Sequence, residues 1–144
     1  YPQLEHTCYT QDALKEYTEA ILTLALVKGD DTLPTPEELN VLPSTYLNGL
    51  TEAASEMRRY ILRLLTNNEI NDVKRLLAAM DEAYTVVFSF GYPDAVTGGL
   101  RRRVDQLRGV LERTRGDVTT SIRQERLLTA MRDFETRFDV DTEA

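Results

Sequence analysis

Four glutamates in two pairs are the residues of this chain whose types and spacing could do chemistry. Glu16 and Glu19 are three positions apart, and Glu52 and Glu56 are four positions apart. In a helix, either spacing places both carboxylates on one side. If the two helices pack side by side, the four carboxylates can converge, and such oxygen ligands suit a hard divalent cation such as Mg²⁺. The spacing therefore predicts a metal site on the condition that the two helices are neighbours.

The second pair also has an interpretation without a metal. Arg59 and Arg63 follow Glu52 and Glu56 at helical spacing, on the face opposite the apolar residues of that segment. Such a face is typical of a solvated stripe of ion pairs, each of which contributes about 0.2–0.5 kcal/mol. Taken alone, this pair favours a solvent-exposed helix surface.

The first pair is harder to explain as a solvated surface. Glu16 and Glu19 point to the side of their helix that becomes apolar one turn later, and no arginine adjoins them. At about 6 Å and an effective dielectric near 20, their repulsion is on the order of 2–3 kcal/mol. A cation, the solvent or a proton on one of them must relieve it. This pair is therefore as consistent with a functional role as with a structural one.

The composition limits the classes of function. The chain has 144 residues, 42% of them hydrophobic, and a net charge of −7, so a single globular domain is expected and binding of duplex DNA through charge alone is disfavoured. No apolar run approaches the roughly 18 residues of a membrane span. One cysteine, Cys8, and one histidine, His6, exclude an intrachain disulfide and a four-ligand zinc site within one chain. We expect a cytoplasmic protein.

The apolar spacing predicts an all-α protein, an antiparallel bundle of about six helices. Residues Thr35-Pro36-Glu37-Glu38 form a capping box at one helix start, and Ser44 is expected to cap the next helix. Gly116 and Asp117 are expected to end one helix and begin another. The expected helices cover residues 10–28, a short stretch from 36 that stops before 43, then 45–65, 69–90, 94–115 and 118–138. One domain, 1–138, and an acidic tail, 139–144, follow from this division.

Several short segments together resemble the translin superfamily, which comprises translin and its partner, translin-associated factor X (TRAX). No one of them is diagnostic, but their order and spacing are similar to those of the single-type archaeal members. The segments are Glu16-Tyr17-Thr18-Glu19-Ala20, Tyr46-Leu47-Asn48-Gly49-Leu50, Glu52 with Glu56-Met57-Arg58, Ser89-Phe90-Gly91-Tyr92, residues 92–102 and Arg115-Gly116.

The resemblance implies a function as well as a fold. It implies closed, shell-like homo-oligomers that bind single-stranded RNA, or single-stranded DNA. For the factor-X branch it implies an endoribonuclease dependent on Mg²⁺, or on Mn²⁺ in its place, whose catalytic and metal-binding carboxylates correspond to Glu16, Glu19, Glu52 and Glu56. The alternative is a non-catalytic binding protein of the translin type. Arginines would hold the phosphates, and the candidates are Arg59 and Arg63, then Arg101, Arg102 and Arg103.

The chain departs from the family pattern at two points. The family has Asp where this chain has Glu52, and one extra methylene can displace a metal-binding carboxylate by more than about 1 Å. Family members also have a long helix ahead of the one that carries Glu16 and Glu19. We expect that this helix either was cut away or is supplied by a partner chain as a separate N-terminal helix segment. Without that helix, an exposed apolar groove is expected.

Overall fold

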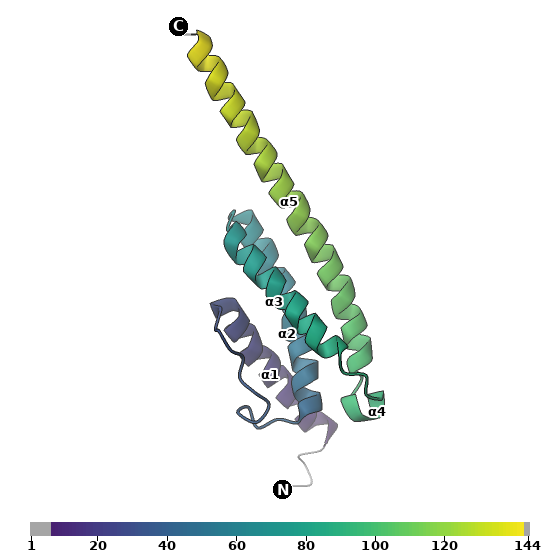
Figure 1. Ribbon diagram of the computed structural model, residues 1–144. Helices are drawn as coiled ribbons and strands as arrows, with labels where there is room; N and C mark the ends of the chain where they lie inside the picture. Colours follow the sequence, from purple (N-terminus) through teal and green to yellow (C-terminus); the bar gives the residue numbers. More distant parts are fainter. Residues whose placement is uncertain (1–6, 143–144) are drawn as a thin grey trace.

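All regular structure in the described part of the chain is α-helical (Figure 1). The computed structural model describes residues 7–142, with side chains for residues 7–137. Its five helices are α1 (Cys8–Lys28), α2 (Pro43–Thr66), α3 (Ile70–Phe88), α4 (Asp94–Thr97) and α5 (Leu100–Thr142). The predicted all-α helical bundle is confirmed, with five helices where about six were expected. Helix α5 runs past residue 138 to Thr142. The division of the chain into a domain and a tail at residue 138 stays a prediction.

The segment between α1 and α2 forms turns where a short helix was expected. The predicted capping box is present, because the Thr35 amide donates to the Glu38 carboxylate at 2.7 Å and the Glu38 amide donates to the Thr35 hydroxyl at 3.2 Å. Asn40 then takes a left-handed conformation with φ 53°. This conformation turns the chain away from a helical path after a single turn.

In the second half of the chain, the helical structure is interrupted at a different glycine from the one expected. Gly98 and Gly99 have φ of +61° and +81°, a left-handed conformation that favours glycine, and they separate α4 from α5. By contrast, α5 runs through Gly116 without interruption, so the expected cap there is wrong. Thr114 and Val118 are buried against the bundle on either side of Gly116, and this packing holds the helix together across it.

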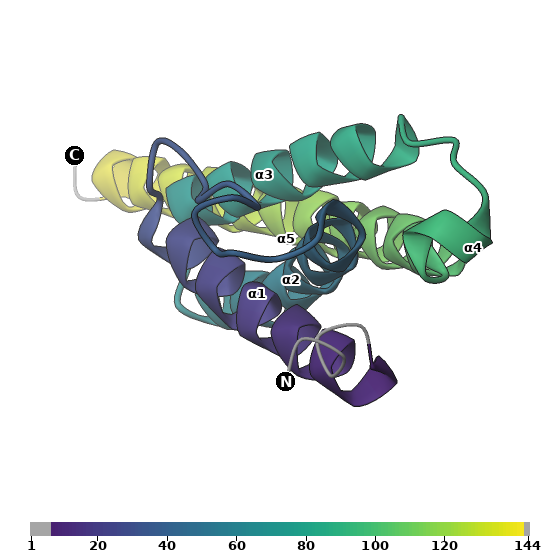
Figure 2. The same cartoon turned by 90° about the horizontal axis from the view of Figure 1, so that it is seen from below.

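The core lies around α2, which packs against α1, α3 and α5 (Figure 2). The apolar spacing of α2 predicts a buried stripe of Leu47, Leu50, Ala54, Met57, Ile61 and Leu64, and these residues are buried or partly buried in the core. The spacing of α1 predicts a stripe of Leu14, Tyr17, Ile21, Leu24 and Ala25, and the observed buried face is rotated from it. Of that stripe Ala25 is buried, but Tyr17 and Leu24 are 47% and 50% exposed, and Thr18 and Leu22 are buried in their place. The largest fully buried apolar side chains are Leu22, Met57, Ile61, Leu76, Met80, Leu100 and Leu107.

The carboxyl end of α1 is fixed to α3 by one arginine. Arg75 of α3 donates to the carbonyl oxygens of Leu26 at 2.8 Å and Val27 at 3.1 Å. These are carbonyls of the last helical turn, which have no partner within a helix and which attract positive charge. Gly29 then ends the helix in a left-handed conformation, φ +79°. The contact holds the last turn of α1 against α3.

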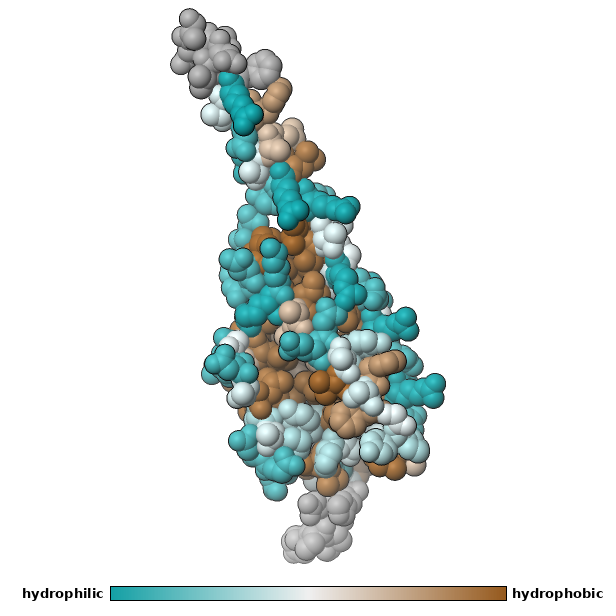
Figure 3. All heavy atoms as spheres, viewed as in Figure 1, coloured by the Kyte–Doolittle hydropathy of each residue, from teal (hydrophilic) through white to brown (hydrophobic). Residues whose placement is uncertain are grey.

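The carboxyl half of α5 projects beyond the other helices (Figure 1). Leu127, Met131 and Phe134 are 62%, 52% and 62% exposed, and their spacing places them on one side of the helix. Figure 3 shows apolar side chains among polar ones along this projection and over the bundle below it. In the described part of the chain, no helix combines the length and the apolar character that crossing a bilayer requires.

Replacing Gly116 with alanine should stabilise the protein. Gly116 is helical and exposed, and a Cβ atom added there would meet nothing within 4 Å. Alanine removes the helix-propensity penalty of glycine, so the free energy of unfolding should rise by about 0.5–1 kcal/mol. Thermal or urea denaturation measures this change. A decrease would show that the helix does not continue through this position.

Candidate metal centre

The close approach of α1 and α2 depends on a glycine. A Cβ atom added at Gly49 of α2 would lie 2.8 Å from Cγ2 of Thr18 and 3.2 Å from the carbonyl oxygen of Lys15, both on α1. Thr18 is fully buried, and its hydroxyl donates to the Leu14 carbonyl at 2.7 Å, so its polar group is satisfied within α1. The two backbones can therefore approach each other closely one turn away from the glutamates.

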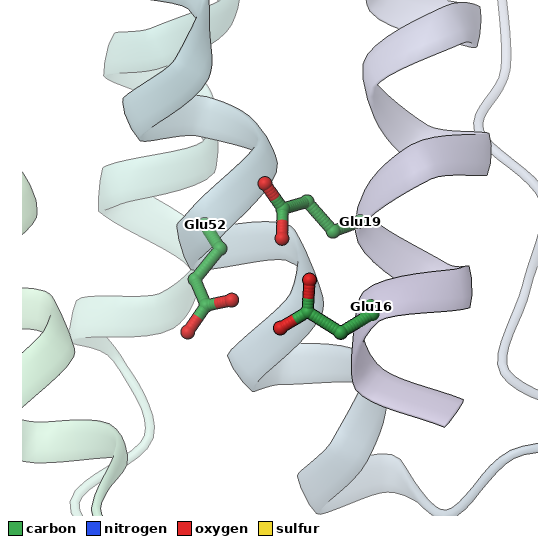
Figure 4. A group of neighbouring side chains, drawn as sticks. All are labelled: Glu16, Glu19 and Glu52. Atoms are coloured by element: carbon green, nitrogen blue, oxygen red, sulfur yellow. The ribbon is translucent and has the colours of Figure 1, made fainter. Parts of the chain in front are cut away.

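Three of the four predicted glutamates converge across this contact (Figure 4). Glu16 and Glu19 of α1 and Glu52 of α2 each offer one carboxylate oxygen, and these three atoms all lie within 4.8 Å of one another. Glu56 is not part of this group, and its carboxylate accepts a hydrogen bond from Arg59 at 3.0 Å. The condition set by the sequence is thus met for three carboxylates, which we call the acidic cluster.

Two cations lie within the acidic cluster. The Lys15 ammonium is 3.0 Å from Glu16 Oε1 and 3.0 Å from Glu52 Oε2. Arg103, from the first turn of α5, donates from Nε to Glu52 Oε1 at 2.9 Å. The solvated stripe of ion pairs expected on α2 is therefore present only at Glu56 and Arg59, because Glu52 is partly enclosed between α1 and α5.

Arg103 is held in place by polar groups of two other elements. Its Nη1 donates to Asn48 Oδ1 at 3.2 Å and to the Gly98 carbonyl at 3.1 Å. Asn48 is itself buried, and its Nδ2 donates to the carbonyls of Ser44 at 2.8 Å and Thr97 at 2.7 Å. This network connects α2, α4 and the start of α5, and it fixes one wall of the acidic cluster.

Electrostatics divide the carboxylates of the acidic cluster into two kinds. Partial burial, a hydrogen bond that a protonated Glu19 can donate to Glu52, and the charges of Glu52 and Glu16 raise the pKa of Glu19 from 4.5 to about 7. Burial also opposes ionisation of Glu52, but hydrogen bonds from Arg103 and Lys15 outweigh it and lower its pKa. The cluster therefore holds a firmly ionised carboxylate beside one whose ionisation is opposed by its surroundings.

The predicted phosphate-binding arginines point in different directions. Arg59 and Arg63 are exposed on α2, and the Arg63 guanidinium lies 5.2 Å from the centre of the Tyr60 ring. Arg101 and Arg102 are exposed at the start of α5, whereas Arg103 is the arginine of the acidic cluster. Consecutive helical positions face different sides, so these three arginines do not form one patch.

Three residues that shape the acidic cluster were not identified from the sequence. Lys15 directly precedes Glu16, and this adjacent positive charge was the available signal for it. Gly49 lies inside a helical pattern, where an isolated glycine can indicate a close backbone approach. Asn48 carries no such signal, because two of its partners, Thr97 and Arg103, come from segments far away in the sequence.

The raised pKa of Glu19 predicts a pH dependence of stability. Because the folded state holds this proton more tightly than the unfolded chain, the contribution is fully present below about pH 4.5 and is lost as pH rises through about 7. Glu19 is partly exposed, so the loss should be only roughly 1 kcal/mol after allowance for solvent screening. Melting curves at pH 5.5 and pH 8 for the wild type and Glu19→Gln check it. Equal pH dependence of the two proteins would contradict it.

Comparison with known proteins identifies solved structures with the same arrangement of helices. No protein-family model matches the chain. The arrangement of helices is a translin-superfamily fold, which confirms the resemblance found in the sequence. Two solved structures share it: the crystal structure of AfC3PO, with a TM-score of 0.75 and 31% identity, and the structure of an AfC3PO–duplex RNA complex, with a TM-score of 0.72 and 30% identity.

The matches cover most of this chain and a smaller share of the other proteins. Both structural matches include 84% of this chain. They include 63% of the chain in the AfC3PO crystal structure and 64% of the chain in the RNA complex. A curated relative, the uncharacterized protein MJ0175 of Methanocaldococcus jannaschii, is 33% identical over 124 residues. That alignment includes 85% of this chain and 55% of the relative, so this chain spans little more than half of the length of MJ0175.

Proposed function

We propose that this chain binds RNA within an oligomer and hydrolyses its phosphodiester bonds at the acidic cluster with the help of Mg²⁺ or Mn²⁺. The observation that carries the proposal is the convergence of Glu16, Glu19 and Glu52 from two helices within 4.8 Å. Carboxylate oxygens are the ligands that Mg²⁺ prefers. The raised pKa of Glu19 supports the same conclusion, because a carboxylate that repels its neighbours is stabilised by a divalent cation.

The residues of the cluster have distinct roles in this proposal. Glu16, Glu19 and Glu52 would hold the metal, and a bound Mg²⁺ would polarise the phosphoryl group and lower the pKa of the attacking water. Arg103 orients Glu52 through its 2.9 Å hydrogen bond. The exposed Arg59 lies further along α2, where a guanidinium can hold a neighbouring phosphate in a bidentate manner.

The AfC3PO neighbour guides the choice of substrate. That protein has been solved with duplex RNA, whereas the sequence of this chain led us to expect single-stranded RNA. Both are negatively charged ligands for the same kind of arginine surface, so both belong in the test. Single-stranded DNA provides a third ligand, which separates recognition of the 2′-hydroxyl from recognition of the backbone.

A second candidate function is RNA binding without catalysis. Two observations favour it: Lys15 and Arg103 already neutralise much of the charge of Glu52, and Glu56 lies outside the acidic cluster. In this case the carboxylates are structural partners of the two cations. The arginines and exposed aromatic side chains would then hold the RNA alone.

Labelled RNA distinguishes the two candidates. The protein is incubated with single-stranded and duplex RNA in MgCl₂, MnCl₂ or EDTA, and its affinity is measured separately by fluorescence anisotropy at low salt in EDTA. We expect fragments only with a divalent metal. Binding without metal-dependent fragments would establish the second candidate, and no binding even at low salt would exclude both.

A further inference from the structure

Lys15 occupies an unusual position for a lysine. Its side chain is only 14% exposed, and its ammonium bridges α1 and α2 by contacts of 3.0 Å to Glu16 and 3.0 Å to Glu52. Burial opposes its positive charge, but hydrogen bonds to these two glutamates outweigh this effect and raise its pKa. The chain therefore supplies a permanent cation to two of the three carboxylates that converge.

The contacts of Glu52 leave no oxygen without a cationic partner. Glu52 Oε2 is 3.0 Å from the Lys15 ammonium, and Oε1 accepts from Lys15 at 3.1 Å and from Arg103 at 2.9 Å. A magnesium ion needs its ligand oxygens at about 2.0–2.1 Å. An ion bound to Glu16 Oε1 and Glu52 Oε2 would lie close to the ammonium that contacts both oxygens, and the two positive charges would repel each other.

We propose that Lys15 is the built-in counter-ion of the acidic cluster and that its ammonium competes with a divalent cation for Glu16 and Glu52. Lys15 thereby sets the metal affinity of the cluster and stabilises it when no metal is bound. This inference rests on the proposed function, because it concerns the metal proposed to act there.

The surroundings of Lys15 give the displaced side chain a place to go. A groove of mixed polar and apolar lining adjoins the cluster, and Lys15 forms part of its wall together with Asp12, Thr45, Asn48 and Arg103. Asp12 lies one turn before Lys15 on α1 and is exposed. A flexible four-carbon side chain can turn from the cluster into this groove and remain close to a carboxylate.

Simple electrostatics gives the size of the expected effect. If the ammonium stays within about 6 Å of the bound metal, its repulsion of a doubly charged ion weakens binding about tenfold even at the dielectric constant of water. Competition for the same oxygens adds to this effect. Removing the charge of Lys15 should therefore tighten metal binding, although it also removes an ion pair that stabilises the fold.

Titration of the metal-free protein with Mn²⁺ by calorimetry at pH 8 tests the proposal. We expect Lys15→Met to bind Mn²⁺ at least about tenfold more tightly than the wild type. Lys74→Met serves as the matched control, because Lys74 is exposed on α3, and its affinity should stay within about twofold of the wild type. Lys15→Gln, a polar replacement of similar length, is the second variant if Lys15→Met does not fold.

The outcomes separate this inference from the proposed function. Unchanged or weaker Mn²⁺ binding by a folded Lys15 variant, with measurable binding by the wild type, would overturn the role of Lys15 alone. Binding by the variant and none by the wild type would support competition in its strongest form. No binding by either protein would overturn both the metal site and this inference.

Discussion

Glu19→Gln is expected to reduce metal-dependent RNA cleavage by on the order of 100-fold while leaving RNA affinity unchanged or higher. Glutamine has nearly the same shape as glutamate, but it is a poor ligand for Mg²⁺ and brings no negative charge. Glu19 is the carboxylate with a pKa of about 7, so this substitution also removes repulsion from the cluster at pH 8. The variant should consequently be folded and slightly more stable, and a loss of activity cannot then be attributed to unfolding.

Two further variants complete this experiment. Glu82→Gln, at an exposed position of α3, should leave cleavage within about twofold of the wild type. Glu56→Gln tests the fourth predicted carboxylate, and because Glu56 is paired with Arg59 outside the acidic cluster, we expect a smaller loss than for Glu19→Gln. Initial rates in MgCl₂ provide the comparison. Wild-type activity of Glu19→Gln would show that the acidic cluster is not the catalytic centre.

Gly49→Ala is expected to lower the free energy of unfolding by about 1–3 kcal/mol. The added methyl group would lie 2.8 Å from Thr18 Cγ2 and 3.2 Å from the Lys15 carbonyl, which is backbone that cannot rotate away. Relief requires α1 to move away from α2. That movement separates Glu16 and Glu19 from Glu52, so metal binding should weaken together with stability.

A second glycine gives this prediction its control. The same substitution at Gly116 meets no neighbour and should be stabilising, so the two variants have effects of opposite sign. Chemical denaturation measures the stability, and Mn²⁺ titration measures the site. If Gly49→Ala is as stable as the wild type and binds metal equally well, the two helices are not in the close contact described.

The sequence predicted the features that depend on periodicity within one helix. The buried stripe of α2, with Leu50, Met57 and Ile61, follows from one-sided burial. The carboxylate spacing likewise placed Glu16 beside Glu19. For α1 the same reasoning failed, because that helix is apolar on nearly all sides beyond its first half. A threonine whose hydroxyl is satisfied within the helix then occupies the core position, and the pattern of apolar residues does not reveal this.

The features that depend on contact between helices could not be predicted in this way. Whether Glu52 or Glu56 meets the glutamates of α1 depends on how far α2 is shifted along α1. The spacing of residues within one helix does not determine that shift. The partnership of Arg103 with Glu52 requires the left-handed turn at Gly98 to place the first turn of α5. Capping rules also assigned Gly116 to a helix end, because they do not include the packing of Val118 against the bundle.

The length of α5 has a consequence for how its backbone exchanges hydrogen with solvent. The part from Leu100 to Val118 is anchored by side chains buried in the core, whereas the part that carries Leu127, Met131 and Phe134 has exposed side chains. An isolated helical segment is only marginally stable in water. Deuterium should therefore enter the distal amides of the monomer within seconds and the anchored amides only on global unfolding. One uninterrupted helix would thus show two widely different protection factors.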